Sequence, residues 1–223
     1  MRIIIVAIPN RVHGDPVIAG IRHQDIAQEV HCHTHGIIEL GCGANTLVTV
    51  NGIAAQVLFV NASQINFVTP GNIPTAGTAT IQATCNGTES GTVTAPLAPV
   101  APAAFTESAT GAGQASVINA NGTVNTAANR ATPGNYISVY VTGFGPYAPV
   151  GANGLMTLQF PVTATVGGLP ATVLYAGAAP TETSGLQQIN IGVPAGATAG
   201  ISVPLVLTVD GVSTPANITV AIN

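Results

Sequence analysis

Two stretches of this chain repeat one another: residues 50–60 read VNGIAAQVLFV, and residues 166–176 read VGGLPATVLYA. A second pair follows in the same order. It consists of QINFVTP at Gln64–Pro70 and QINIGVP at Gln188–Pro194. Self-similarity at a fixed spacing marks a duplicated structural unit, so this repeat decides the expected architecture.

A third pair completes the repeat. One strand-like run ends in Asn86-Gly87 and its counterpart ends in Asp210-Gly211. The second and third pairs are offset by 124 residues, because 188 − 64 and 210 − 86 both equal 124, whereas the first pair is offset by 116. Three matches in one order therefore indicate two copies of a unit, the second with a small insertion.

The duplicated runs have the period of β-strands. Leu205, Leu207 and Val209 alternate with Val206 and Thr208, which places them on opposite faces of a strand. The runs are separated by dipeptides that suit two-residue hairpin turns. These are Asn51-Gly52, Asn86-Gly87, Asn121-Gly122, Gly167-Gly168 and Asp210-Gly211. Many short strands at this spacing predict an all-β chain with two tandem immunoglobulin-like antiparallel β-sandwiches.

The expected domain plan has four parts. Residues 1–45 form an atypical segment that contains His and Cys, and residues 46–95 form a first, partial sandwich. Residues 96–104 form a proline-rich linker, and residues 105–223 form the second sandwich. The linker prediction depends on Pro96, Pro99 and Pro102, whose spacing of three suits polyproline II. A final edge strand with prolines on its open side is the alternative.

Composition excludes several partners. Only 12 of 223 residues are charged (4 Lys+Arg and 8 Asp+Glu), and none is Lys. A chain with a net charge of −4 and four Arg offers no basic patch for nucleic acid or anionic membranes. No apolar run has the roughly 18 residues of a membrane span, and Met1–Ile8 is too short for a signal peptide. The uncharged, Thr- and Asn-rich surface is typical of secreted β proteins.

The one cluster with metal-ligand chemistry is His31, Cys32, His33 and His35, with Cys42 downstream. On a strand the three His would share one face, and imidazole with thiolate suits zinc or copper. The spacing matches no closed structural zinc pattern, so adventitious metal affinity is the alternative. Three cysteines do not describe a disulfide framework, although a Cys32–Cys42 bridge stays open.

No catalytic constellation is found. After residue 42 the chain has no His and only five charged residues, which are Glu89, Glu107, Arg130, Glu182 and Asp210. There is no Gly-x-Ser-x-Gly elbow. We therefore predict no enzyme activity and no required cofactor.

The repeated Gln-Ile-Asn motif is the most distinctive polar element. Gln64 and Asn66, like Gln188 and Asn190, would share a strand face. We favour a structural role, in which these amides satisfy backbone groups near a strand end, over a face directed at a glycan or a partner. The aromatic content of 4% argues against a carbohydrate module, because such modules stack sugars on aromatic rings.

Several motifs in order resemble a known family. They are GQASVINANGTVNTAANRATPGNYISVYVTGFGP (Gly113–Pro146), VTATVGGLPATVLYAGAAP (Val162–Pro180), GLQQINIGVPAGATAG (Gly185–Gly200) and VPLVLTVDGVSTPANITVAI (Val203–Ile222). VTVNGIAAQVLFVNASQINFVTP (Val48–Pro70) and APAAFT (Ala101–Thr106) fit as well. From about residue 46 onward the chain resembles the uncharacterised C-terminal domain family of large secreted proteins of Solibacter-type acidobacteria.

The resemblance implies tandem immunoglobulin-like domains, an extracellular or cell-surface location, and no known activity or site residues. Residues 1–45 do not fit it, so the first sandwich is expected to lack its own opening strands. The resulting function hypothesis is a non-enzymatic extracellular structural, adhesion or assembly module with a protein or cell-surface partner. One alternative is a subunit that self-assembles through the open sheet edge, with Arg2–Ile8 as the donated strand. The other is a metal-binding domain.

Overall fold

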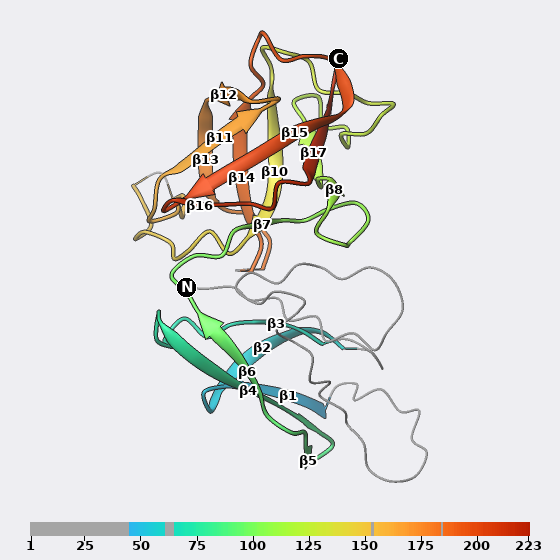
Figure 1. Cartoon of the computed structure of the whole chain (residues 1–223). Helices are drawn as coiled ribbons and strands as arrows, with labels where there is room; N and C mark the ends of the chain where they lie inside the picture. Colours follow the sequence, from blue (N-terminus) through green and yellow to red (C-terminus); the bar gives the residue numbers. More distant parts are fainter. Residues whose placement is uncertain (1–44, 61–64, 153, 184) are drawn as a thin grey trace. The chain divides into compact units, whose positions relative to one another are not determined.

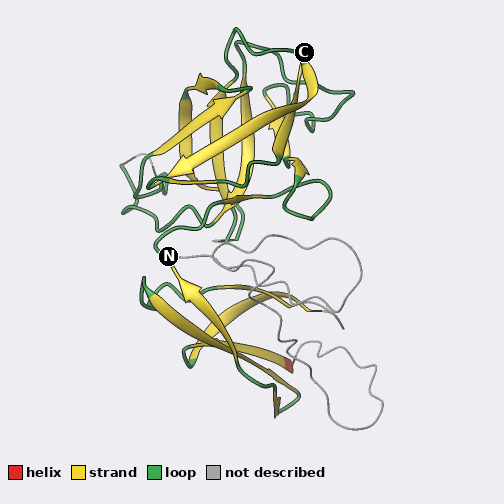
Figure 2. Cartoon of the chain, in the orientation of Figure 1, coloured by secondary structure: helices red, strands yellow, loops and turns green. Residues whose placement is uncertain are grey.

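A computed structural model describes residues 45–60, 65–152, 154–183 and 185–223. Strands and loops make up almost all of this described chain (Figure 2). The strands form antiparallel sheets, so the all-β prediction is confirmed. The chain divides into two compact units, unit 1 at Met1–Pro99 and unit 2 at Val100–Asn223 (Figure 1).

Unit 1 contains one sheet with strand order β3-β2-β1-β4-β5, in which β6 also pairs with β4. The strands are β1 (Thr46–Val50), β2 (Ile53–Val60), β3 (Ile65–Val68), β4 (Gly77–Cys85), β5 (Thr88–Glu89) and β6 (Val93–Leu97). Its hydrophobic core centres on Phe67, Val48 and Ile81. The β1–β2 hairpin turns at Asn51-Gly52 with φ values of 51° and 75°, as the dipeptide predicts.

Unit 2 contains two sheets. The first has the order β13-β14-β10-β7, with β9 also paired to β10, and the second has the order β12-β11-β15-β17-β8, with β16 paired to β15. The strands of the first sheet are β7 (Ala103–Ala104), β9 (Val117–Asn119), β10 (Tyr136–Thr142), β13 (Val173–Ala178) and β14 (Gln187–Gly192). Those of the second are β8 (Gly113–Gln114), β11 (Val162–Val166), β12 (Leu169–Ala171), β15 (Gly200–Val209), β16 (Val212–Ser213) and β17 (Ile218–Ile222).

The core of unit 2 is built from the inward side chains of both sheets. Ile137 and Val139 of β10 are fully buried in the same cluster as Leu205 and Leu207 of β15. The alternation expected for 205–209 is confirmed, because residues 205, 207 and 209 are buried while 206 and 208 are partly exposed. Burial of these aliphatic side chains on both inner faces is the main source of stability for such a sandwich-like arrangement.

The sequence repeat is also a structural repeat, and both copies contain the same irregularity of strand pairing. The β2–β3 register shifts between Val57 and Phe59, and the β13–β14 register shifts between Val173 and Tyr175. Both pairs are offset by 116 residues, as the sequence match requires. The extra residue of each bulge is an exposed leucine, Leu58 or Leu174.

The structure places strands at both ends of the predicted linker. Pro96 belongs to β6, paired with Thr78, and residues 103–104 form β7, so the stretch predicted as a linker contains strand at both ends. The opening strands of unit 2 are β7 to β10. At the 116-residue offset of the repeat, the counterparts of β9 and β10 in unit 1 would fall within residues 1–44, outside the described residues, where Arg2–Ile8 also lies. The incomplete first sandwich and its open edge therefore stay predictions.

Candidate functional site

The outward side of the β10–β14 sheet in unit 2 gathers aromatic and amide side chains. Along β10, residues 136, 138 and 140 point away from the core, because 137, 139 and 141 fill it. Along β14 the same alternation turns Gln188 and Asn190 outward. We call this surface the tyrosine–amide face. It comprises Tyr136, Ser138, Tyr140, Tyr175, Gln188 and Asn190.

Strand register arranges this face as rows across the sheet. Tyr140 lies opposite Gln188, which lies opposite Gly177 on β13. In the next row Ser138 lies opposite Asn190, which lies opposite Tyr175. The four-residue separation of Tyr136 and Tyr140 along β10 corresponds to about 13 Å at roughly 3.3 Å per residue. Three tyrosines thus surround the two amides.

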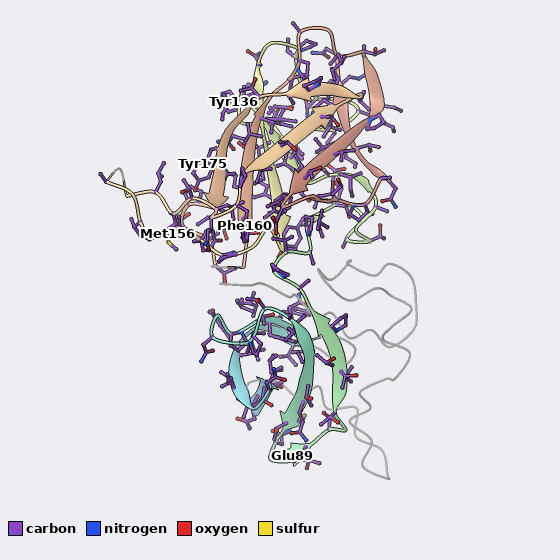
Figure 3. The ribbon with its side chains drawn as sticks, turned by 60° about the vertical axis from the view of Figure 1, so that its left-hand side comes forward. Glu89, Tyr136, Met156, Phe160 and Tyr175 are labelled. Atoms are coloured by element: carbon purple, nitrogen blue, oxygen red, sulfur yellow. The ribbon has the colours of Figure 1, made fainter. Side chains whose placement is uncertain are left out.

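Tyr175 is held in place by its own strand. Its Oη donates a hydrogen bond of 2.7 Å to the carbonyl oxygen of Ala178, and burial raises the pKa of the phenol. The ring reaches across Gly177, where a Cβ atom would lie only 2.7 Å from the Tyr175 Cζ atom. Figure 3 shows Tyr175 and Tyr136 at the same side of unit 2. Glycine at 177 therefore lets the ring lie along the sheet.

The two outward amides bind each other. Gln188 Nε2 donates to Asn190 Oδ1 at 2.8 Å. This arrangement differs from our expectation for the Gln-Ile-Asn motif in unit 2, in which these amides would bind backbone groups. Because each amide has two N–H donors and a carbonyl oxygen, the pair still offers polar atoms to a ligand. The shared strand face predicted for Gln188 and Asn190 is confirmed, whereas Gln64 lies outside the described residues.

The residue with the predicted structural role is the neighbouring Gln187, which the sequence reasoning missed. Its side chain is fully buried. Oε1 accepts from the N–H of Phe144 at 2.9 Å, and Nε2 donates to the carbonyl of Gly145 at 3.0 Å. Burial raises the pKa of nearby Tyr147 to about 12, although its hydrogen bond with Gln187 acts in the opposite direction. Because side chains alternate along a strand, an outward Gln188 predicts that its neighbour Gln187 points into the core.

The tyrosine–amide face carries no charged side chain. In the described ranges the ionisable side chains other than Tyr and Cys are all exposed and lie in loops, turns or one short strand; they are Glu89, Glu107, Arg130, Glu182 and Asp210. Arg130 Nε donates to the carbonyl of Ala127. No group of three or more His, Cys, Asp or Glu that could hold a metal occurs among the described residues. The predicted ligands His31, Cys32, His33 and His35 lie outside them, so that site is still a prediction.

Cys85, at the end of β4, is disulfide-bonded. The other two cysteines of the chain, Cys32 and Cys42, lie outside the described residues. The predicted Cys32–Cys42 alternative falls on these residues and stays a prediction.

Unit 1 carries a related arrangement. Phe59 of β2 lies opposite Asn66 of β3, just as Tyr175 lies opposite Asn190 in unit 2. Phe59 is 47% exposed. An aromatic ring beside an asparagine, next to a bulged leucine, is therefore a duplicated surface element.

Comparison with known proteins finds similarity to solved structures only at low sequence identity. No family model matches the chain, and no relative is found among curated proteins. Two similar solved structures are the Bacteroides ovatus mixed-linkage glucan utilization locus SGBP-B in complex with a mixed-linkage heptasaccharide (15% identity, TM-score 0.27) and the surface glycan-binding protein PbSGBP-B from Prevotella bryantii (13%, 0.29). Alignment covers 80% and 76% of this chain, which spans 36% and 32% of theirs. Within the described residues, no helix is long and apolar enough to cross a membrane.

Proposed function

We propose that this protein is a non-enzymatic extracellular binding module and that the tyrosine–amide face of unit 2 binds a neutral polysaccharide. One observation carries the proposal. Three of the four tyrosines of the chain lie on one uncharged sheet face, around a hydrogen-bonded amide pair. A low total of aromatic residues argued against carbohydrate binding, but the few tyrosines present are concentrated where a ligand could meet them.

The chemistry of the face suits a sugar chain. Aromatic rings present an apolar surface on which the C–H face of a sugar ring can stack, and phenols add a hydroxyl for hydrogen bonding. The amides of Gln188 and Asn190 provide both donors and acceptors for sugar hydroxyls. An acidic or basic ligand would lose its hydration without gaining a counter-charge, because the face has none. A neutral glycan therefore fits better than a charged one.

The spacing of the tyrosines favours an extended ligand. Tyr136 and Tyr140 are about 13 Å apart along β10, and Tyr175 lies two strands, or roughly 10 Å, from β10. A surface of these dimensions can contact more than one sugar ring of the same chain. We therefore expect polysaccharides and longer oligosaccharides to bind better than monosaccharides.

Two further observations support a non-enzymatic extracellular protein. The four acids of the described residues are exposed in turns or a two-residue strand, and the described residues include no His that could act with them in acid–base catalysis. The disulfide at Cys85 favours an oxidising compartment such as the cell exterior. Both agree with an extracellular module that binds its ligand without converting it.

Affinity gel electrophoresis of the full chain in gels containing neutral polysaccharides tests the proposal. We expect at least one neutral polysaccharide to slow migration and a carboxylated polysaccharide to have no effect. Tyr136→Ala and Tyr140→Ala should abolish the retardation, while Tyr136→Phe should keep most of it. Absence of retardation by every neutral polysaccharide would refute the proposal.

A matched control lies on the other sheet. Thr163→Ala and Thr165→Ala change side chains that point away from the core on β11, in the second sheet of unit 2. These variants should bind as the wild type does. If they weaken binding as much as the tyrosine variants, the ligand does not use the tyrosine–amide face. Release of sugars during long incubation with the retained polysaccharide would contradict the non-enzymatic part.

A further inference from the structure

The last strand of unit 2 pairs with a strand from the early part of the same unit. β8, near its start, runs parallel to β17, at its end, with Gly113 opposite Ile218 and Gln114 opposite Thr219. All other pairs of named strands in the described residues are antiparallel. The N–H groups of Gly113 and Ala115 donate to the carbonyls of Asn217 and Thr219 at 2.8 and 2.9 Å.

The parallel ladder continues along β17 after β8 has ended. Ala131 forms a parallel bridge to Ile222. Its N–H donates to the carbonyl of Ala221, and its carbonyl accepts from the N–H of Asn223, both at 2.9 Å. The edge of β17 is therefore bonded along its whole length, up to the last residue of unit 2.

A buried side chain fills the gap between the two ladder segments. Asn125 is fully buried, its Oδ1 accepts from the N–H of Ala221, and its Nδ2 donates to the carbonyl of Ala221, both at 2.8 Å. The Gln114 amide donates to the same Oδ1 at 2.8 Å, and Asn119 Oδ1 accepts from Nδ2 at 2.9 Å. Asn125 thus replaces a backbone peptide in the ladder and is fixed by its neighbours.

This geometry determines how tension would act on unit 2. When two strands are parallel, the N-terminal end of one and the C-terminal end of the other lie at opposite ends of their ladder. Figure 1 shows β7 and the C-terminus at opposite ends of unit 2. Once the two-residue strand β7 has separated from β10, a force that pulls the two ends apart slides β8 and β17 past each other. The hydrogen bonds are then loaded together, whereas strands pulled from adjacent ends separate one bond at a time.

We propose that unit 2 is a load-bearing module in which the ladder of β17 with Gly113, Ala115, Asn125 and Ala131 is a shear clamp. The clamp resists unfolding when tension runs along the chain. A module that holds a ligand at a surface experiences such tension, but the inference depends only on the β17 edge and not on the tyrosine–amide face. Forced unfolding is governed by the unfolding rate, so the clamp acts on kinetic stability.

Single-molecule force spectroscopy of the full chain tests the clamp. With handles at both chain ends, unfolding of the 124 residues of unit 2 (223 − 100 + 1) is recognised by a length release of about 40 nm. In a second geometry, one handle is moved to an azide-bearing residue at exposed position Ala199. Because Gly200 pairs with Ile222 in an antiparallel ladder, pulling between 199 and the C-terminus peels β17 away.

We expect the end-to-end rupture force to exceed the peeling force about twofold or more at the same loading rate. Equal forces would overturn the proposal. A pair of variants adds a second criterion. Asn125→Ala removes a link of the ladder, whereas Thr214→Val removes a buried bond to the N–H of Leu207, away from β17. Only Asn125→Ala should lower the end-to-end rupture force, and equal reductions in both variants would also contradict the clamp.

Discussion

Replacement of Gln187 tests how much its buried hydrogen bonds stabilise unit 2. The side chain satisfies the N–H of Phe144 and the carbonyl of Gly145 in a fully buried position. Gln187→Leu leaves both backbone groups without these partners. At about 1–3 kcal/mol for each unsatisfied group, we expect a loss of about 2–6 kcal/mol in the free energy of unfolding.

Gln187→Glu refines the same prediction through pH. A protonated carboxyl can accept from Phe144 and donate to Gly145, as the amide does. An ionised one is buried and faces a carbonyl oxygen, so its folded-state pKa is raised above the ordinary value of about 4.3. The stability of this variant is therefore present below about pH 4 and is lost as pH rises through the raised pKa. A shift of about three units corresponds to about 4 kcal/mol at neutral pH.

Urea unfolding followed by tyrosine fluorescence measures these changes, because all four tyrosines lie in unit 2 and the chain has no Trp. Gln188→Leu is the matched control, since it makes the same substitution one residue along on the outward face. We expect it to change stability by less than about 1 kcal/mol. The reasoning is refuted if Gln187→Leu costs no more than Gln188→Leu, or if Gln187→Glu follows the pH profile of the wild type.

Three further predictions concern other features. Gly145→Ala should destabilise unit 2 by about 1–3 kcal/mol in urea unfolding, because the new Cβ atom would lie 2.9 Å from Phe160 at a φ of 92°. Gly134→Ala is the control: its φ is similar, at 85°, but its Cβ atom would enter open space, so it should cost less. The raised pKa of Tyr147, about 12, means that unit 2 loses stability as pH rises from 10 to 12; Tyr147→Phe should flatten this loss in alkaline unfolding experiments. Cys85 should resist alkylation in denaturant until a reductant is added, and labelling without reductant would contradict its disulfide.

Much of the fold could be predicted because it depends on local patterns. The dipeptides Asn51-Gly52 and Asp210-Gly211 turn with positive φ, as their chemistry requires. The alternation in β15 carried over into burial. Turn chemistry and strand period follow from residues close together in sequence, so no knowledge of distant contacts was needed for them.

The assignment of roles to the amides was only partly predictable. A repeated Gln-Ile-Asn indicated that these residues share a face, but not which amide would be structural. The answer depends on where β14 meets the loop at residues 144–145, more than 40 residues earlier in the chain. Sequence reasoning therefore identified the right strand and placed the structural role on the outward amides, whereas the buried Gln187 holds it.

By itself, the sequence determined that this is a β protein with a duplicated unit, few charges and no lysine, because composition, period and turn chemistry are local properties. Only the tertiary structure decided that three tyrosines separated by up to 39 residues (175 − 136) share one face with an amide pair, and that Asn125 completes the β17 ladder 96 residues away. Both depend on strand register between distant segments. Register is set by the packing of whole sheets around a common core, which no short stretch of sequence contains.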